Sequence, residues 1–445
     1  MNPGLVVKLR PTGPWRIGPD SGARNRVDFI YHSDSLYSAV TAAMGRMGSL
    51  EEWLGATARA SEPAVCFGSC FPFVDGVSFV VPPRTVWPPA SPSALSARVR
   101  WRSARFVPLE VVEAMLAGRP LDDNRWSVDG PSECLVPAGR PGPFRTALRW
   151  SAAVDRLTGA TERHSTACIE FRPGCGLWTV VSFQDMAAQA RWAEPVKAAF
   201  RLLADSGFGG ERSRGWGRAE APEFTEGDLP EMILPSPRPE PPVAVADLPP
   251  AEPPAPPEIP EQSLPPAESE PAGQASWPVF PTALPPAEPT IALPGPEVDL
   301  AGGAAAETAA VEASSSIAVL EMEEEAEVAE APTESEPVLA PLAEEIIVVQ
   351  PGSRAHWLLS LFTPGEGDSV DWRRGNYSVL ARGGRVESAA GCGELKKQIP
   401  MVAEGSVLYA GAAPRGSAAN VAPDGFAHPV YRAGFAIAIP LPEVR

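Results

Sequence analysis

Glycine and arginine alternate densely in one stretch, residues 207–218, which reads GFGGERSRGWGR. Glycine lets backbone N–H groups approach an anion closely, and arginine supplies planar, bidentate donors for phosphate. We therefore expect this stretch to bind a bent phosphate backbone, with a tryptophan as a stacking face. The expected contact residues are Gly207, Gly209, Gly210, Arg212, Ser213, Arg214, Gly215, Trp216, Gly217 and Arg218.

The position of this glycine-rich stretch argues against a nucleotide cofactor. A dinucleotide-binding fingerprint follows a strand and opens a helix, whereas residues 207–218 follow a predicted helix, and no Gly-Lys-Ser/Thr completes a P-loop. The six cysteines show no Cys-x-x-Cys pair and no Cys/His spacing typical of zinc. We expect reduced cysteines, no cofactor and no metal. The alternative reading of the stretch is a flexible surface loop.

A second basic stretch lies at residues 98–105, RVRWRSAR. If it forms a strand, Arg98, Arg100 and Arg102 line one face and can follow a row of phosphates, and Trp101 can stack on a base. The alternative is a solvated strand edge that prevents aggregation.

The elements that must position these residues follow from hydrophobic periodicity and from Gly and Pro punctuation. A helix is predicted after Ser33 as its N-cap, with Leu36, Val40, Ala43, Met44 and Met47 on its buried face. A second helix is predicted over residues 195–206, with Pro195 in its first turn and Gly207 at its end. The predicted strands are 5–10, 77–81, 166–171, 177–183, 356–362 and 434–439.

Composition divides the chain. Residues 221–350 hold 27 of the 54 prolines and 26 acidic residues against one basic residue, so we expect a disordered, acidic insert. The rest of the chain carries a formal charge of +7, which suits a polyanionic partner. We predict an α+β fold with a folded unit at 1–220, the insert at 221–350 and a second folded unit at 351–445.

Several motifs give the chain a family resemblance. Residues 32–37 (HSDSLY) resemble the HSDTLF signature of CRISPR-associated RAMP proteins, and residues 207–218 resemble their GxGGxRSxGxGR loop. Residues 153–160, residues 358–364 and the segments from 404 to 440 resemble the fourth Csm subunit. Two features depart from that pattern: Ala433 stands where the family often has an aromatic residue, and the acidic insert is additional.

The resemblance implies two ferredoxin-like (RRM-like) RAMP domains in a non-catalytic, RNA-binding subunit of a type III-A (Csm) complex. That subunit grips the repeat-derived 5′ tag of the CRISPR RNA (crRNA) and docks on the large polymerase-like subunit. It also starts the filament of backbone RAMP subunits, with target RNA nearby. It further implies RNA contacts at His32, Ser33, Arg156, Lys396 and Lys397. For Arg156 an ion pair with Asp155 is the alternative, and for the two lysines a solvated charge.

A rival hypothesis is a repeat-processing endoribonuclease of the same superfamily, with His32 or Asp34 active. Against it, the four histidines show no spacing typical of a general acid and base pair, and a carboxylate at Asp34 suits the first turn of a helix. The equivalent subunit of a type III-B complex is a further alternative. The first eight residues lack the pattern of a signal peptide and no long apolar run is present, so we expect no membrane partner and a cytoplasmic location.

Overall fold

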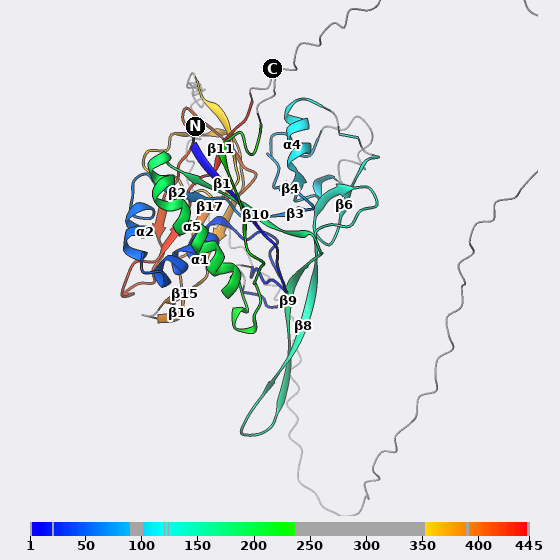
Figure 1. The fold of residues 1–445 in the computed structure, drawn as a ribbon, viewed down its shortest axis with the longest axis vertical. Coiled ribbons are helices and arrows are strands. Elements are labelled where there is room, and N and C mark those ends of the chain that lie inside the picture. The colour runs from blue at the N-terminus through cyan, green and yellow to red at the C-terminus, as the bar shows by residue number, and fades with distance from the viewer. Residues whose placement is uncertain are drawn as a thin grey trace, which may run out of the picture. The chain divides into compact units, whose positions relative to one another are not determined.

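The computed structural model describes residues 2–19, 22–89, 101–119, 121–122, 124–235, 352–388 and 391–442. The described residues belong to one compact unit, which combines 1–240 with 346–445. The fold is mixed, with antiparallel sheets and few helices (Figure 1). Nowhere in the described ranges does a helix have the length and apolar character needed to span a membrane.

The largest sheet is built on β1 (Asn2–Leu9), whose alternate residues Leu5, Val7 and Leu9 are fully buried. β1 pairs antiparallel with β10 (Cys175–Phe183) on one side and with β11 (Glu223–Leu229) on the other. The order is β11-β1-β10-β3-β4-β5, and β2 also pairs with β10. The remaining strands are β2 (Val65–Phe67), β3 (Phe71–Val74), β4 (Val77–Val80) and β5 (Val107–Pro108).

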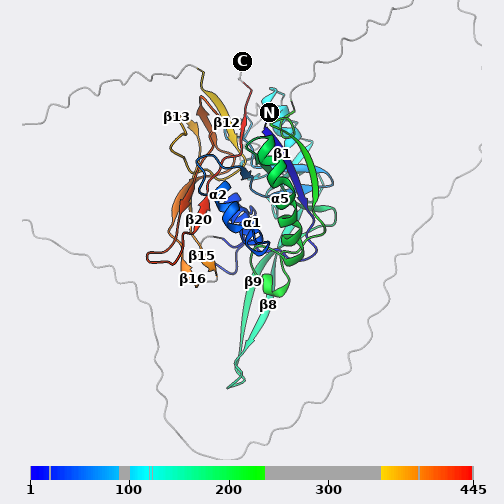
Figure 2. The ribbon, with the colours of Figure 1, turned by 60° about the vertical axis from the view of Figure 1, so that its left-hand side comes forward.

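Helices cover this sheet beside its central strands. α1 (Ser33–Arg46) and α5 (Met186–Ser206) lie side by side (Figures 1 and 2), and α2 (Leu50–Ala56) packs against α1. Trp53 on α2 joins the two longer helices: its ring lies 5.9 Å from Tyr37 of α1 and 5.3 Å from Trp192 of α5. A short helix, α4 (Leu109–Leu116), follows β5.

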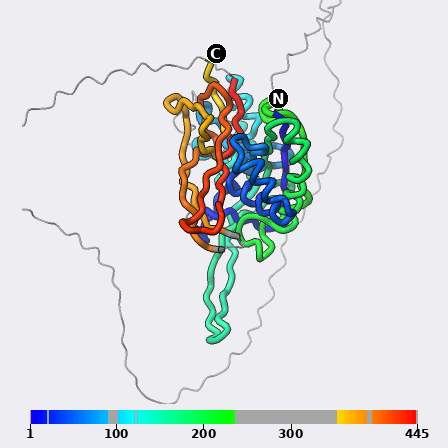
Figure 3. The backbone as a smooth tube through the Cα atoms, turned by 90° about the vertical axis from the view of Figure 1, so that its left-hand side faces the viewer, coloured from blue at the N-terminus to red at the C-terminus, as the bar shows by residue number. Residues whose placement is uncertain are grey.

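Two hairpins interrupt this arrangement. β6 (Trp126–Asp129) pairs with β7 (Cys134–Pro137), and β8 (Phe144–Val154) pairs with β9 (Thr161–Phe171). The β8–β9 hairpin extends away from the sheets, as the tube in Figure 3 shows. Two large apolar side chains on its outer part are open to solvent: Trp150 is 63% exposed, with Arg163 5.3 Å from its ring centroid, and Val154 is 61% exposed.

The residues from 352 onward form strands. A four-stranded sheet has the order β13-β18-β12-β21, and further two-stranded sheets surround it. The strands are β12 (Arg354–Leu358), β13 (Val370–Asn376), β14 (Val379–Arg382), β15 (Arg385–Ser388), β16 (Gly391–Leu395), β17 (Ile399–Val402), β18 (Val407–Ala410), β19 (Ala418–Asn420), β20 (Tyr431–Ala433) and β21 (Ala438–Pro440). Residues 352–388 and 391–442 contain no helix, so the helices expected of a second ferredoxin-like domain are not found there.

Most predicted elements are present, but the strands expected at 356–362 and 434–439 are only partly found, since β12 ends at Leu358 and β21 begins at Ala438. Four further corrections follow. α5 begins at Met186, so Pro195 lies inside the helix rather than in its first turn. The N-cap of α1 is His32, and Ser33 is the first helical residue. Met47 caps the C-terminus of α1 and is 38% exposed instead of buried.

The fourth correction moves the start of the insert. Residues 223–229 form β11, a full partner of β1, although they were expected to be disordered. β11 carries a charged residue at Glu223, Glu226 and Asp228, which makes it resemble the acidic sequence that follows. Pairing with a buried neighbour overrides this composition. Residues 236–351 lie outside the described residues.

Candidate nucleic-acid interface

A groove of about 1300 Å³ has three main walls that are far apart in the chain, and Gly18, Pro19 and Gly22 also line it. One wall is α1, with Ser35, Ser38, Ala39 and Ala42, and a second is the glycine-rich loop. The third comes from the strands after residue 380. The groove is strongly basic: six lining residues are cationic and one is acidic, Asp34. The cationic residues are Arg46, Arg212, Arg382, Arg385, Lys396 and Arg432.

The glycine-rich loop owes much of its composition to its own packing. Gly217 has a φ of +77°, and a Cβ there would lie 2.1 Å from the carbonyl oxygen of Phe208. A Cβ on Gly207 would lie 2.4 Å from the carbonyl oxygen of Trp216. These glycines let the two ends of the loop cross closely. Gly215 differs, since nothing lies within 4 Å of the position of its Cβ.

The arginines of this loop point to different surroundings. Arg212 lines the groove together with Gly207 and Gly209. Arg214 is 3.2 Å from Glu211 and donates a hydrogen bond of 3.2 Å to Ser151 Oγ on β8, so it ties the loop to the hairpin. The residues of the loop that line the groove are Gly207, Phe208, Gly209 and Arg212. Gly210, Ser213, Arg214, Gly215, Trp216, Gly217 and Arg218 do not line it.

The first residues of the HSD signature, at the start of α1, make their contacts inside the protein. His32 is 3% exposed, and its Nδ1 and Nε2 lie 2.7 Å from Glu404 and 3.1 Å from Asp28. Ser33 accepts a hydrogen bond from Leu361 N at 3.0 Å. The prediction that His32 and Ser33 contact RNA is therefore not supported, because both side chains are buried. Both residues join the start of α1 to the strands after residue 352.

Asp34 lies at the bottom of the groove and is 1% exposed. It accepts hydrogen bonds from Arg382 Nε at 3.2 Å and Nη2 at 3.0 Å, and a further one from Arg432 Nη1. Burial alone raises the pKa of Asp34, but the two guanidinium groups outweigh it and lower the pKa to about 2. Asp34 thus orients two arginines that line the groove.

The charge on His32 follows from its two carboxylate neighbours. Burial by itself lowers the pKa of His32, yet the negative charge of Glu404 and the hydrogen bonds that His32 donates to Asp28 and Glu404 raise it to about 9. The same contacts hold the pKa of Glu404 below its usual range despite its burial. His32 is therefore an imidazolium at neutral pH. Its contact with Glu404 is a buried ion pair.

The second predicted basic stretch is only partly described. Arg98 and Arg100 lie outside the described residues, whereas Trp101 and Arg102 form a helical turn instead of a strand. Trp101 is fully buried and its ring lies 6.5 Å from that of Trp87. The expectation that Trp101 stacks on a base is therefore wrong. Its large apolar ring belongs to the core.

The two adjacent lysines separate. Lys396 lines the groove, but Lys397 points to Asp424, with Nζ 2.7 Å from the carboxylate. Arg156 is exposed at the tip of the β8–β9 hairpin and does not line the groove. The neighbouring Asp155 accepts hydrogen bonds from Leu157 N and Thr158 Oγ1. These bonds fix the hairpin turn.

Four groove arginines were missed by the sequence analysis. Arg46 is the last residue of α1, and Arg385 begins β15. Arg382 and Arg432 come from β14 and β20, and they meet at Asp34. Only Arg432 carried a signal, because it belongs to the HPVYR motif at residues 428–432.

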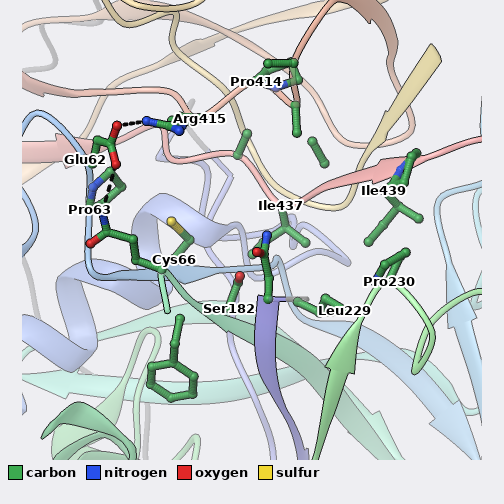
Figure 4. Close-up of a pocket in the computed structure, with 18 of the residues that line it drawn as sticks. Glu62, Pro63, Cys66, Ser182, Leu229, Pro230, Pro414, Arg415, Ile437 and Ile439 are labelled. Carbon is green, nitrogen blue, oxygen red and sulfur yellow. Dashed lines mark hydrogen bonds and ion pairs between the residues drawn. The ribbon is translucent and has the colours of Figure 1, made fainter. Parts of the chain in front are cut away.

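A smaller cavity of about 520 Å³ lies elsewhere, between the end of β11 and β21. Figure 4 shows its lining, with Leu229, Pro230, Ile437 and Ile439 on one side and the Glu62–Arg415 ion pair on the other. None of the residues expected to bind RNA lines it. The basic groove is therefore the better candidate for the interface.

Comparison with known families gives one match. Residues 352–441 match the model described as the CRISPR Csm4 C-terminal domain. This part of the chain is thus similar to the Csm4 C-terminal domain, and the Csm resemblance predicted from the sequence is confirmed by this match. The matched residues include Arg382, Arg385, Lys396 and Arg432 of the groove.

The solved structures to which this chain is similar include two complexes. One is a Csm1–Csm4 cassette with cA4, with 15% identity over 100% of this chain and 99% of that chain and a TM-score of 0.45. The other is a Csm3–Csm4 subcomplex of the type III-A CRISPR-Cas interference complex, with 11% identity over 100% of both chains and a TM-score of 0.49. A search of curated proteins found no match.

Proposed function

We propose that this chain is a non-catalytic subunit of a type III-A CRISPR–Cas complex and that its basic groove holds the repeat-derived 5′ tag of the guide RNA. One observation carries the proposal. The RAMP-like glycine-rich loop, the HSD helix and the Csm4 C-terminal domain all line the same groove, which has six cationic residues.

The groove suits a single strand of RNA. Proteins recognise RNA sequence mainly where the bases are unstacked, and arginine side chains bind phosphates and stack on bases. The small side chains of Ser38, Ala39 and Ala42 leave α1 open along one wall. An extended strand can therefore approach the helix closely while the cations on the other walls contact its phosphates.

The Csm4 resemblance implies the partners of this proposed subunit. They are the large polymerase-like subunit and the backbone RAMP subunit, with target RNA close by. Cleavage of target RNA belongs to the partners in this scheme. Co-purification separates a type III-A from a type III-B complex, because the two contain different large and backbone subunits.

The test is guide-RNA binding by the full chain. Arg212→Ala and Lys396→Ala should each weaken binding of tagged guide RNA and lower the slope of log K against log salt by roughly 0.7. Arg140→Ala is the matched control, since Arg140 is exposed and does not line the groove. Unchanged affinity and slope in both groove variants would refute the proposal. The same RNA with a scrambled tag reports whether the groove recognises the tag itself.

A further inference from the structure

The edge of the four-stranded sheet carries a wide bulge. Asp371 on β13 pairs with Tyr409 on β18, and the next pair is Asn376 with Val407. β13 thus advances five positions while β18 advances two. The extra chain, residues 372–375, reads WRRG and lies within β13, which is an edge strand of the sheet. Bulges of this kind re-aim side chains and occur next to functional sites.

The bulge is held in a defined shape. Asp371 Oδ1 accepts hydrogen bonds from the backbone N–H of Arg373 at 3.1 Å and of Arg374 at 3.4 Å. Asn376 Nδ2 donates to the carbonyl oxygen of Arg84 at 3.2 Å, which brings the loop after β4 beside the bulge. Hydrogen bonds within the bulge and to the loop after β4 therefore fix the shape of this surface.

Two aromatic rings on this surface remain open to solvent. Trp372 is 37% exposed and Tyr377 is 39% exposed, and their ring centroids lie 5.3 Å apart at an interplanar angle of 74°. Phe362, which is fully buried, supports Trp372 from below at 6.4 Å. The pair is held by its own edge-to-face contact and by Phe362, and it offers open ring faces on which a ligand can stack.

Two arginines are held by residues next to this aromatic pair. The guanidinium of Arg374 lies 4.2 Å from the ring centroid of Tyr409 and donates a hydrogen bond of 3.0 Å to Ser353 Oγ. Arg84 donates one of 2.7 Å to Ser378 Oγ. These partners are neutral, so the contacts orient the guanidinium groups and leave their positive charge for a ligand. Arg373 is exposed between Trp372 and Arg374.

We propose that Trp372, Tyr377 and the arginines around them form a second RNA-binding surface, on which bases of a single strand stack. Single-stranded nucleic acid is bound by aromatic stacking faces combined with cationic side chains, and this surface has both. A partner that adds a strand to the sheet fits less well, because the bulge interrupts the edge of β13. In Figure 2, β13 lies at the opposite end of the sheets from β15 and β16, which flank the groove. The site is thus separate from the proposed tag site.

The experiment uses the full chain and a fluorescein-labelled oligouridine of 12 nucleotides at low salt. Trp372→Ala and Tyr377→Ala should each weaken binding roughly fivefold or more, the size expected for losing one base stack. Trp372→Phe should keep most of the affinity because it keeps a ring, and Val379→Ala is the control for an exposed apolar side chain nearby. Both alanine variants are compared also in an Arg212→Ala background, so that binding in the groove does not hide their effect.

Photo-crosslinking with 4-thiouridine supplies a second measurement, since it should label a peptide containing residues 370–379. Equal oligouridine affinity for wild type and both alanine variants, with no label in that peptide, would overturn the proposal. Variants that keep RNA affinity but no longer co-purify with protein partners would also overturn it, because the surface would then be a protein interface. If Arg212→Ala binds tagged guide RNA as tightly as the wild type does, only the proposal for the groove is contradicted. The two proposals can therefore fail independently of each other.

Discussion

Arg382 donates two hydrogen bonds to the carboxylate of Asp34, one to each oxygen, across 348 positions of the chain. The two residues are 6% and 1% exposed, so this is a buried ion pair. It joins α1, which carries the HSD sequence, to the residues that match the Csm4 C-terminal domain model. Because Arg432 binds the same carboxylate, one acidic side chain organises two of the six cations of the groove.

Asp34→Asn tests this arrangement. The substitution keeps the shape of the side chain but leaves two buried guanidinium groups without a counter-ion, so we expect the free energy of unfolding to fall by about 3–5 kcal/mol. Denaturant unfolding measures it. Asp205→Asn, at an exposed position on α5, should stay within about 0.5 kcal/mol of wild type. If the two variants are equally stable, Asp34 has no organising role.

The ion pair of His32 predicts a dependence of stability on pH. The pKa of His32 is raised to about 9 in the folded state from its usual 6.5, so the folded protein binds the proton more tightly than the unfolded chain. The resulting stabilisation is complete below pH 6.5 and is lost as the pH rises through 9. We expect the melting temperature to fall between pH 6.5 and 9.5. His32→Gln should flatten this fall, and an identical slope in the variant would contradict the assignment.

The glycine-rich loop and α1 could be predicted from the sequence because their signals are local. Gly207 ends α5 as expected, and Leu36, Val40, Ala43 and Met44 are all buried on α1. The N-terminus of α5 was missed although Asp185 caps it by accepting a hydrogen bond from Ala188 N. Pro195 misled the prediction, because a proline usually marks the start of a helix and this one lies inside α5.

The groove itself could be predicted only in part. Arg212 and Lys396 belong to recognisable basic segments, whereas the contact of Asp34 with Arg382 depends on how distant segments pack. Burial also removes from the surface some side chains that look functional in the sequence. Trp101 and His32 have side chains suited to RNA, but both lie in the interior. β8 was missed although Leu148, Trp150 and Val154 alternate with Arg149 and Ser151, because these apolar residues stay exposed instead of marking a buried face.

Arg212 and Arg214 should differ in their effect on RNA binding, although both were expected to contact phosphate. Arg212 lines the groove, and Arg214 is held by Glu211 and Ser151. We expect Arg212→Ala to weaken guide-RNA binding clearly more than Arg214→Ala does, as measured by fluorescence anisotropy at two salt concentrations. The reverse order would show that the RNA follows the hairpin side of the loop instead of the groove.

We also predict that the purified full-length protein does not cleave repeat RNA or target RNA, with or without a divalent metal. A general base must reach the 2′-OH, and the two side chains of the rival hypothesis, His32 and Asp34, are buried in ion pairs. Gel assays of radiolabelled RNA test this. Cleavage that is absent from a mock preparation, and that disappears in His32→Gln at a temperature where the variant is still folded, would support the endoribonuclease.

The last prediction concerns the acidic segment, residues 241–345, which holds 21 acidic residues and no basic ones. Its deletion takes the formal net charge from −18 to +3. The deletion starts at 241 because β11 occupies Glu223–Leu229 and pairs with β1, so that an earlier boundary would damage the main sheet. We expect the shortened protein to fold and to keep its affinity for tagged guide RNA, which depends on fixed contacts in the groove. Non-specific RNA should bind more tightly at about 50 mM salt, where screening is weaker than at 0.1 M.

A full-length variant with every acidic residue of this segment changed to Gln or Asn separates the effect of charge from that of length. Its affinity for non-specific RNA should match that of the deletion. If full-length, neutralised and shortened proteins bind non-specific RNA equally, the segment is an inert spacer and its charge has no effect on RNA binding.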